Sequence, residues 1–304
     1  MADQILITGG SGLIGRALTA MLLKYGYRVS WLTQSNSSMN EVETFHWNIE
    51  KMEIDQKAIE TADYIVHLAG EGIANKRWNK LQKDKILRSR VDSCKLIKQV
   101  ITKNNPKPKA FICASGVGYY GYDNGGVWLK ETSSFGDDFV ANVVKEWEAS
   151  ADELEKIGIR TVKLRTGLVL SRKGGALAKI MGPVKWGLGA PLGSGDQYMS
   201  WIHIDDLCEL YLKTITNTGM KGIYNAVSEN PVSNREFNMV LSKVMKKPFF
   251  MPPVPSFVLR ILLGEMASLV LGSGRVSAEK LVQSGITFKY PDLESALTNL
   301  LSKS

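Results

Sequence analysis

The first part of the chain alternates short apolar runs with longer amphipathic stretches. The apolar runs lie at residues 5–8 (ILIT), 28–33 (RVSWLT), 44–48 (TFHWN, the weakest) and 64–69 (YIVHLA). Helical periodicity covers about residues 14–26 and 79–104. Strands that alternate with helices at this spacing predict βαβ units, and hence a parallel sheet with right-handed crossovers.

The same alternation continues to about residue 170. Residues 110–115 (AFICAS) and 160–167 (RTVKLRTG) are expected to form two further strands, and a helix between them contains residues 139–148 (FVANVVKEWE). We therefore expect an α/β protein with a Rossmann-type, doubly wound parallel sheet over residues 1–170, with sheet contributions to about residue 228.

The pattern changes after about residue 170. Glycine becomes dense over residues 173–195, and a helix at about 203–216, a short strand at 222–227 and further helical segments follow. This predicts a smaller, mostly helical lobe over residues 171–304, which includes a helical domain at about 248–300. Because ligands of such folds bind outside the carboxyl ends of the strands, we expect this lobe to cover that cleft.

A glycine-rich turn, TGGSGLIG, follows the first apolar run and precedes the first helix. Gly9 allows the tight turn, Gly12 lets the backbone approach a pyrophosphate, and Gly15 lets the helix pack closely on the strand. The free N–H groups of the helix N-terminus then favour the phosphates. The residues expected to bind a dinucleotide are Gly9, Ser11, Gly12, Leu13, Ile14, Gly15, Thr33, Gln34, Leu68, Ala69, Gly70, Arg90 and Ser115.

The end of the second strand bears on which dinucleotide binds. NAD-binding proteins usually place Asp or Glu there to hold the ribose 2′-hydroxyl, whereas this chain has Thr33-Gln34-Ser35-Asn36. No carboxylate is present to repel a 2′-phosphate, and no arginine at this spot is present to bind one. Arg90 could supply the charge if its helix starts beside the adenosine. NADP(H) is favoured over NAD(H).

Composition and charge change this picture little. The chain has 304 residues and a formal net charge of +8. Its Lys and Arg residues have acidic neighbours and belong to no nucleic-acid-binding module, which favours solvated helix faces and attraction for phosphorylated small molecules over nucleic acid. Three separated cysteines without a CxxC pattern, together with scattered histidines, predict no metal site.

Two features concern location and assembly. The N-terminus has no secretion-signal pattern, so we expect a cytoplasmic protein. The longest apolar stretch, at 255–272, is interrupted by Arg260 and Glu265 and is not expected to span a membrane. It would form either part of the core or the face of a homodimer.

Several motifs together resemble one family. TGGSGLIG, LAGEGIANKRWN (68–79), SRVDS (89–93) and ASGVGYYG (114–121) are similar to the extended short-chain dehydrogenase/reductases. LRTGLVLSRKGGALAK and GLGAPLGSGDQYMSWIHIDDL resemble one atypical branch, described as nucleoside-diphosphate-sugar epimerase-like and sometimes as SulA-like. The tail resembles the C-terminal domain of unknown function that this branch carries. The resemblance implies a Rossmann fold and an NADP-type cofactor, but no known reaction.

Most members of the superfamily use a Ser, a Tyr and a Lys, the last two in a Tyr-x-x-x-Lys pair, and the branch is understood to lack this set. Ser115 matches the serine. If Lys145 is the lysine, Ala141 takes the tyrosine position; if Trp147 holds the lysine position, Val143 takes the tyrosine position. Neither alternative provides a hydroxyl group, so the usual proton relay cannot be built.

Other residues could take over the proton transfer. Tyr119 and Tyr120 follow Ser115, and His203 lies in WIHIDD; for each of them packing is the competing interpretation. Arg165 would either face the cofactor or form a surface ion pair. The sequence leaves two functions open: an NADP(H)-dependent oxidoreductase or epimerase acting on an unidentified small molecule, such as a nucleotide sugar, or a non-catalytic NADP-binding sensor or assembly protein, perhaps linked to cell division.

Overall fold

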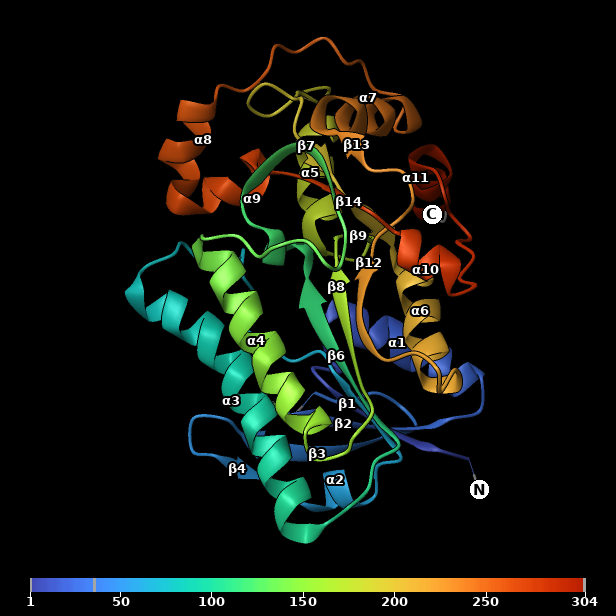
Figure 1. Cartoon of the computed structure of the whole chain (residues 1–304). Helices are drawn as coiled ribbons and strands as arrows, with labels where there is room; N and C mark the ends of the chain where they lie inside the picture. Colours follow the sequence, from blue (N-terminus) through green and yellow to red (C-terminus); the bar gives the residue numbers. More distant parts are fainter. Residues whose placement is uncertain (1, 35–36, 303–304) are drawn as a thin grey trace.

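A twisted, mostly parallel sheet of eight strands forms the centre of the molecule (Figure 1). The structure, a computed structural model, describes residues 2–34 and 37–302. The sheet order is β12-β8-β6-β5-β1-β2-β3-β4, and only the β3–β4 pair is antiparallel. The strands are β1 (Gln4–Thr8), β2 (Arg28–Thr33), β3 (Val42–Asn48), β4 (Glu53–Ile54), β5 (Tyr64–His67), β6 (Ala110–Gly116), β8 (Thr161–Thr166) and β12 (Gly222–Ala226).

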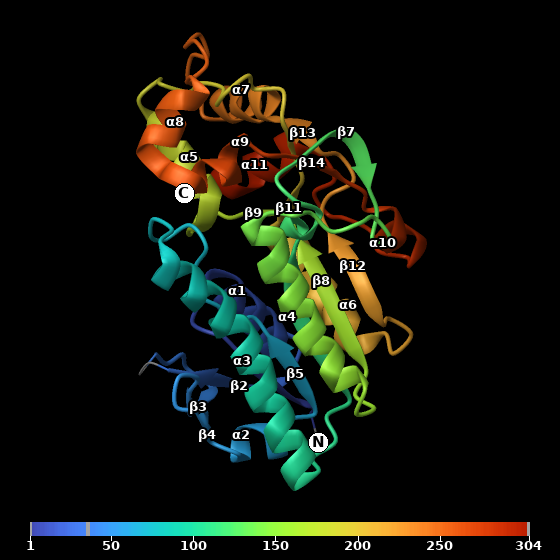
Figure 2. The same ribbon diagram turned by 60° about the vertical axis from the view of Figure 1, so that its left-hand side comes forward.

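Helices cover both faces of this sheet. Helices α1 (Leu13–Lys24) and α6 (Ile204–Thr216) lie on one face, and α2 (Lys57–Glu60), α3 (Lys80–Asn104) and α4 (Phe139–Glu155) lie on the other; α3 and α4 run side by side in both views (Figures 1 and 2). Successive side chains of a strand point to opposite faces. Accordingly Ile5 and Ile7 of β1 belong to the core beneath α1 and α6, whereas Leu6 belongs to the core beneath α3 and α4.

The order of the strands fixes where a ligand can bind. From β1 the chain moves outward to β2 and β3, and then returns to place β5 on the other side of β1. The carboxyl ends of β1 and β5 therefore border the point at which the strand order reverses, which is the usual ligand crevice of such sheets. These observations confirm the expected fold class.

The remaining elements gather beyond the carboxyl ends of the central strands (Figure 1). The helices there are α5 (Gly175–Lys185), α7 (Asn234–Val244), α8 (Ser256–Leu263), α9 (Ser268–Leu271), α10 (Glu279–Gln283) and α11 (Leu293–Ser302), with the 3-10 turns η1 (Val117–Tyr120) and η2 (Gly264–Ala267). Three two-stranded sheets join β9 (Leu168–Leu170) to β11 (Trp201–His203), β10 (Tyr198–Met199) to β13 (Val232–Ser233), and β7 (Asp123–Leu129) to β14 (Ser273–Val276).

The β7–β14 pair corrects one expectation from the sequence. The segment at about 248–300 was expected to be a helical domain, but β14 (Ser273–Val276) within it is a strand that pairs with β7 (Asp123–Leu129). The hydrogen bonds of so short a strand depend on a partner far away in the sequence, which local periodicity does not reveal. The tail is thereby attached to the segment that follows β6. No helix among the described residues is long and apolar enough to cross a membrane.

Candidate functional site

The glycine turn between β1 and α1 has the backbone that its sequence predicts. Gly9 has a φ of +70°, which favours glycine, and its carbonyl accepts a 3.0 Å hydrogen bond from the Gly12 amide. A Cβ atom at Gly15 would lie 2.5 Å from the Gly9 carbonyl oxygen, so only glycine allows this close approach. Gly12 is exposed. Gly9 and Gly15 therefore shape the turn, and Gly12 leaves its outer side open.

The N-termini of α1 and α5 differ from those of the other long helices. Side chains of Asn79, Asp138, His203 and Ser233 cap α3, α4, α6 and α7. Helix α1 begins after Gly12 and α5 after Gly174, and neither has a side-chain cap among the described residues. The start of α5 packs on Leu13, since a Cβ at Gly175 would lie 3.3 Å from that side chain. Two helix ends with available N–H groups thus meet beside the glycine turn, an arrangement that favours an anion.

The turn borders the segment that follows β5, which contains Leu68, Ala69 and Gly70. A Cβ at Gly9 would lie 3.0 Å from the Ala69 backbone, and the Ala69 amide donates to Thr8 Oγ1 at 3.2 Å. His67 is fully buried and joins Thr8 Oγ1 (2.8 Å) to Ser93 Oγ (3.0 Å) through its two ring nitrogens. These contacts fix the two sides of the crevice to each other, and they give His67 a packing role.

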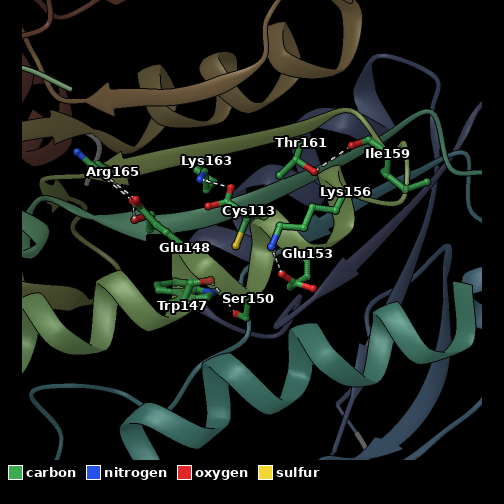
Figure 3. Close-up of polar contacts among 12 residues, drawn as sticks. Cys113, Trp147, Glu148, Ser150, Glu153, Lys156, Ile159, Thr161, Lys163 and Arg165 are labelled. Atoms are coloured by element: carbon green, nitrogen blue, oxygen red, sulfur yellow. Dashed lines mark hydrogen bonds and ion pairs between the residues drawn. The ribbon is translucent and has the colours of Figure 1, made fainter. Parts of the chain in front are cut away.

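Ser115 lies at the carboxyl end of β6 in a cluster of buried polar side chains. The Ser115 hydroxyl donates to Glu148 Oε1 of α4 at 2.6 Å. Arg165 of β8 donates to both oxygens of the same carboxylate at 2.8 Å, as Figure 3 shows. The Tyr120 hydroxyl donates to Asn225 Oδ1 at 2.6 Å and accepts from Arg165 at 3.1 Å. We refer to Ser115, Tyr120, Glu148, Arg165 and Asn225 as the Ser115 cluster.

Charges within the Ser115 cluster compensate one another. Burial alone would lower the pKa of Arg165, but the neighbouring Glu148 carboxylate outweighs it and raises that pKa above its ordinary value. Arg165 is 1% exposed, so the surface ion pair considered for it is wrong. The Asn225 side chain also donates to the Ser277 carbonyl at 3.2 Å, which links the cluster to the segment that follows β14.

The two tyrosines after Ser115 have different surroundings. Burial raises the pKa of Tyr120, and the partners of its hydroxyl lie within the cluster. Tyr119 is partly exposed, and Arg165 Cζ lies 3.3 Å from the centroid of its ring. Of the two phenols, only Tyr119 is therefore partly accessible from solvent.

The face of α4 that meets Ser115 carries Val140, Val144 and Glu148. A Cβ at Gly118 would lie 2.5 Å from Val140 Cγ1, a Cβ at Gly116 would lie 3.9 Å from Val144 Cγ2, and Glu148 accepts from Ser115. These residues are four apart, so they share one side of the helix. Of the alternatives derived from the sequence, Ala141, Val143 and Trp147 are buried, and Lys145 is exposed with its Nζ 4.0 Å from the Phe135 ring centroid.

The residues expected around the adenosine lie in two places. Thr33 ends β2 and is buried, and Gln34 follows it; Ser35 and Asn36 lie outside the described residues. Arg90 lies between α3 and α4, where it donates to the carbonyls of Glu71 (3.0 Å) and Ile86 (2.9 Å) and covers the Trp147 ring at 5.0 Å. Burial lowers the pKa of Arg90 to about 10.

Comparison with known proteins identifies the family. A model described as the NAD dependent epimerase/dehydratase family matches residues 5–226, which extend from β1 to β12 of the central sheet. The chain belongs to this family. A second model, a domain of unknown function named DUF1731, matches residues 254–300.

Relatives of similar length support this assignment. The chain is 33% identical over 301 residues to the epimerase family protein YfhF of Bacillus subtilis and 34% identical over 300 residues to the epimerase family protein SAR0825 of Staphylococcus aureus; the matches cover 98% and 99% of both chains. Among solved structures, human epimerase family protein SDR39U1 with NADPH aligns with a TM-score of 0.88 and 31% identity, over 99% of this chain and 100% of that one. These matches confirm the resemblance to the extended short-chain dehydrogenase/reductases.

His203 lies in the C-terminal part of this epimerase family member. It caps α6, where its Nδ1 accepts from the Asp205 amide at 3.0 Å, and its ring lies 4.0 Å from the Tyr290 ring. His203 is buried, so it has a structural role whether or not it also transfers a proton. Within residues 2–34 and 37–302, no three His, Cys, Asp or Glu side chains are grouped so that they could hold a metal ion.

The sequence reasoning missed Glu148 and Asn225. Asn225 is a polar residue within the apolar run IYNAV, whereas Glu148 stands in KEWEAS among other charged and polar residues. A polar residue within a buried strand usually has a buried partner, so this signal could have marked Asn225 but not Glu148. It could not have named the partners, because Ser115 and Tyr120 come from other elements.

Proposed function

We propose that this epimerase family member binds NADP(H) and uses it in oxidoreductase or epimerase chemistry on a small molecule, without the usual Tyr-x-x-x-Lys pair. The observation that carries the proposal is the glycine turn, with its open Gly12, its uncapped helix N-terminus and a β2 end that lacks a carboxylate. The NADPH bound by the human relative of 31% identity supports the same choice of cofactor.

The residues of the crevice fit a dinucleotide. Amides at the start of α1 would bind the pyrophosphate, Thr33 and Gln34 would border the adenosine ribose, and the Leu68–Gly70 segment would line the other side. The cofactor would supply hydride transfer at its nicotinamide ring. The protein would then need to orient the substrate and to move a proton.

Ser115 and Tyr119 are the residues that we assign to these tasks. Because the Ser115 hydroxyl donates its proton to Glu148, its oxygen remains able to accept a hydrogen bond from a substrate hydroxyl group. Tyr119 is the favoured proton donor, since its ring is partly exposed and lies on the Arg165 guanidinium. Tyr120 would position Arg165, and His203 is the third candidate for proton transfer.

The first substrate class to test is a nucleotide-linked sugar. The relatives are named epimerase family proteins, and the uncapped start of α5 beside the glycine turn suits a second anionic group. The formal charge of +8 favours anionic ligands in general.

Calorimetric titration of the cofactor-stripped protein with NADPH and NADH is the primary test. Tight binding of NADPH and weak binding of NADH are expected. If neither cofactor binds, the proposal is wrong, and a protein partner becomes the object of the search.

Paired tyrosine variants test the chemistry once a turned-over nucleotide sugar has been found. Tyr119→Phe should lower kcat by about 100-fold or more, as the loss of a general acid does, with unchanged unfolding. Tyr120→Phe should lower the free energy of unfolding by about 1–3 kcal/mol, because Asn225 and Arg165 lose a buried partner. Full turnover in Tyr119→Phe would remove Tyr119 as the proton donor.

A non-catalytic NADP(H)-binding sensor or assembly protein is the second candidate function. The sequence of α4 favours it, because neither Ala141 nor Val143, the two alternatives for the tyrosine position, has a hydroxyl group. Tight NADPH binding together with no turnover of any nucleotide sugar would support this function over the first.

A further inference from the structure

We propose that Arg16 is the residue that recognises the 2′-phosphate of NADP(H), an inference that rests on the proposed dinucleotide site. Arg16 is the fourth residue of α1 and directly follows Gly15 of the glycine turn. The sequence pattern assigned it no role. Its surroundings place a positive charge between the glycine turn and the end of β2.

The position of Arg16 is fixed by two contacts. Its Nε donates to the Ser11 carbonyl at 3.0 Å, and its Cζ lies 5.5 Å from the centroid of the Trp31 ring. Ser11 belongs to the glycine turn, and Trp31 lies two residues before the end of β2. The guanidinium group is therefore held between the turn and the end of β2, where the adenosine ribose of a Rossmann dinucleotide lies.

Side chains of β2 alternate between the two faces of the sheet, and this alternation supports the same location for the ribose. Trp31 packs in the core beneath α1, so Thr33 points to that face as well, because side chains two apart share a face. In NAD-binding proteins an acidic residue near this strand end holds the 2′-hydroxyl. Here the strand ends with Thr33 and Gln34, and the nearby charge is that of Arg16.

The guanidinium group has donors left for an anion. Arginine has five N–H donors in a planar fork that matches the oxygens of a phosphate. Nε is the only one of these nitrogens with a hydrogen bond inside residues 2–34 and 37–302, and Arg16 forms no ion pair there. The side chain is exposed, so the other donors are open to solvent and to a ligand.

The charge of Arg16 is also unfavourably placed in the free protein. The N-terminal end of a helix carries a partial positive charge, which disfavours a cation in the first turn. The first turn of α1 contains no acidic residue that could compensate. A bound phosphate would relieve this repulsion, whereas an unphosphorylated ribose would not.

Other nearby arginines do not fit this task. Arg90 of α3 donates to two carbonyls and covers Trp147, and a Cβ at Gly70 would lie 3.0 Å from its Cζ, so it borders the Leu68–Gly70 side of the crevice. Arg28 begins β2, at the opposite end of the strand, where its Nε donates to the Ala2 carbonyl at 3.2 Å. Arg16, in contrast, lies both at the glycine turn and near the carboxyl end of β2.

The test compares cofactor affinities of the full chain. Wild type, Arg16→Gln, Arg16→Lys and the exposed-charge control Arg88→Ala are titrated with NADPH and NADH, and with 2′,5′-ADP and 5′-AMP as fragments. Arg16→Gln keeps most of the stem over Trp31 and should weaken NADPH and 2′,5′-ADP binding by about 10- to 100-fold, the range of a charge-assisted contact. NADH and 5′-AMP binding should stay within about twofold. Arg16→Lys should keep part of the preference, and Arg88→Ala all of it.

The outcomes separate this inference from the proposed function. If Arg16→Gln retains the NADPH/NADH ratio of wild type, the inference is overturned and the dinucleotide site remains. If wild type binds both cofactors equally, Arg16 confers no discrimination and the inference is again wrong. If wild type binds neither cofactor, the proposed function fails and the role of Arg16 fails with it.

Discussion

The glycine turn and the Ser115 cluster lie at the same edge of one sheet, but their polar groups differ in exposure and in hydrogen bonding. At the turn, α1 begins without a side-chain cap among the described residues, and Gly12 and Arg16 are exposed. In the cluster, Ser115, Glu148 and Arg165 bind one another and are almost completely buried. The turn has donors that are open to solvent or to a ligand, whereas the polar groups of the cluster bind one another.

This difference separates residues that are constrained by ligand binding from residues that are constrained by the stability of the fold. Unused donors at the surface add little to the stability of the free protein, so their arrangement points to binding. A buried carboxylate with all its partners in place contributes chiefly to a unique packing and to the position of Ser115. Substitutions in the cluster should therefore reduce stability, and substitutions at the turn should reduce affinity.

The largest effect is expected at Arg165. Arg165→Met would leave the Glu148 carboxylate buried without its cation and should lower the free energy of unfolding by about 3–5 kcal/mol. Urea unfolding followed by circular dichroism measures this change. The double variant Glu148→Gln/Arg165→Met removes the charge as well and should recover part of the loss. A single variant within about 1 kcal/mol of wild type would contradict the view that the cluster serves stability.

The second largest effect is expected at Gly12 of the glycine turn, and it concerns the affinity for NADPH and NADH. Gly12→Ala adds a Cβ 3.2 Å from the Gly9 carbonyl oxygen, on the side where the backbone would approach a pyrophosphate. Its backbone angles, φ −73° and ψ 176°, are open to alanine, so the loss of stability should be near 1 kcal/mol. NADPH and NADH should both bind about tenfold more weakly or worse, unlike in Arg16→Gln, which should affect NADPH alone.

A glycine at the other end of α1 provides the control. Gly26 has a φ of +82° with open space around it, so Gly26→Ala should cost about 1–2 kcal/mol of stability through backbone strain. Its cofactor affinity should equal that of wild type. If Gly26→Ala and Gly12→Ala weaken binding equally, the effect at Gly12 is a general loss of folding and not a loss at the site.

The same contrast explains how much the sequence could predict. The glycine turn is local, because strand, turn and helix follow one another directly, so β1, α1 and the turn between them could be inferred from spacing alone. Apolar periodicity likewise predicted β2, β5, β6 and β8 to within a few residues. The alternation of these strands with helices along the chain then predicted a parallel sheet covered by helices.

The Ser115 cluster could not be inferred in this way. Glu148 meets Ser115 and Arg165 only after α4 has packed across β6 and β8, and Asn225 joins through β12. Sequence spacing left two possible alignments for α4, and it could not show that Val140 and Val144 pack beside Gly118 and Gly116. Long-range pairings such as β7 with β14 are missed for the same reason, because neither strand carries a signal of its partner.

The smallest effect is expected at Glu153, one turn and a half after Glu148 on the same helix. Glu153 is partly exposed and pairs with Lys156 and Lys98, whose hydrogen bonds and charges lower its pKa to about 2. A lowered carboxyl pKa stabilises the folded protein at pH values above the ordinary pKa near 4.5. This contribution is lost as the pH falls from 4.5 towards 2. Glu153→Gln should therefore slightly lower the Tm at pH 7, and the difference from wild type should shrink below pH 4.5. Added salt should reduce the difference as well, since it screens exposed charges, whereas the loss in Arg165→Met should persist in salt. A Glu153→Gln effect as large and as salt-resistant as that of Arg165→Met would mean that burial is not what distinguishes the two carboxylates of α4.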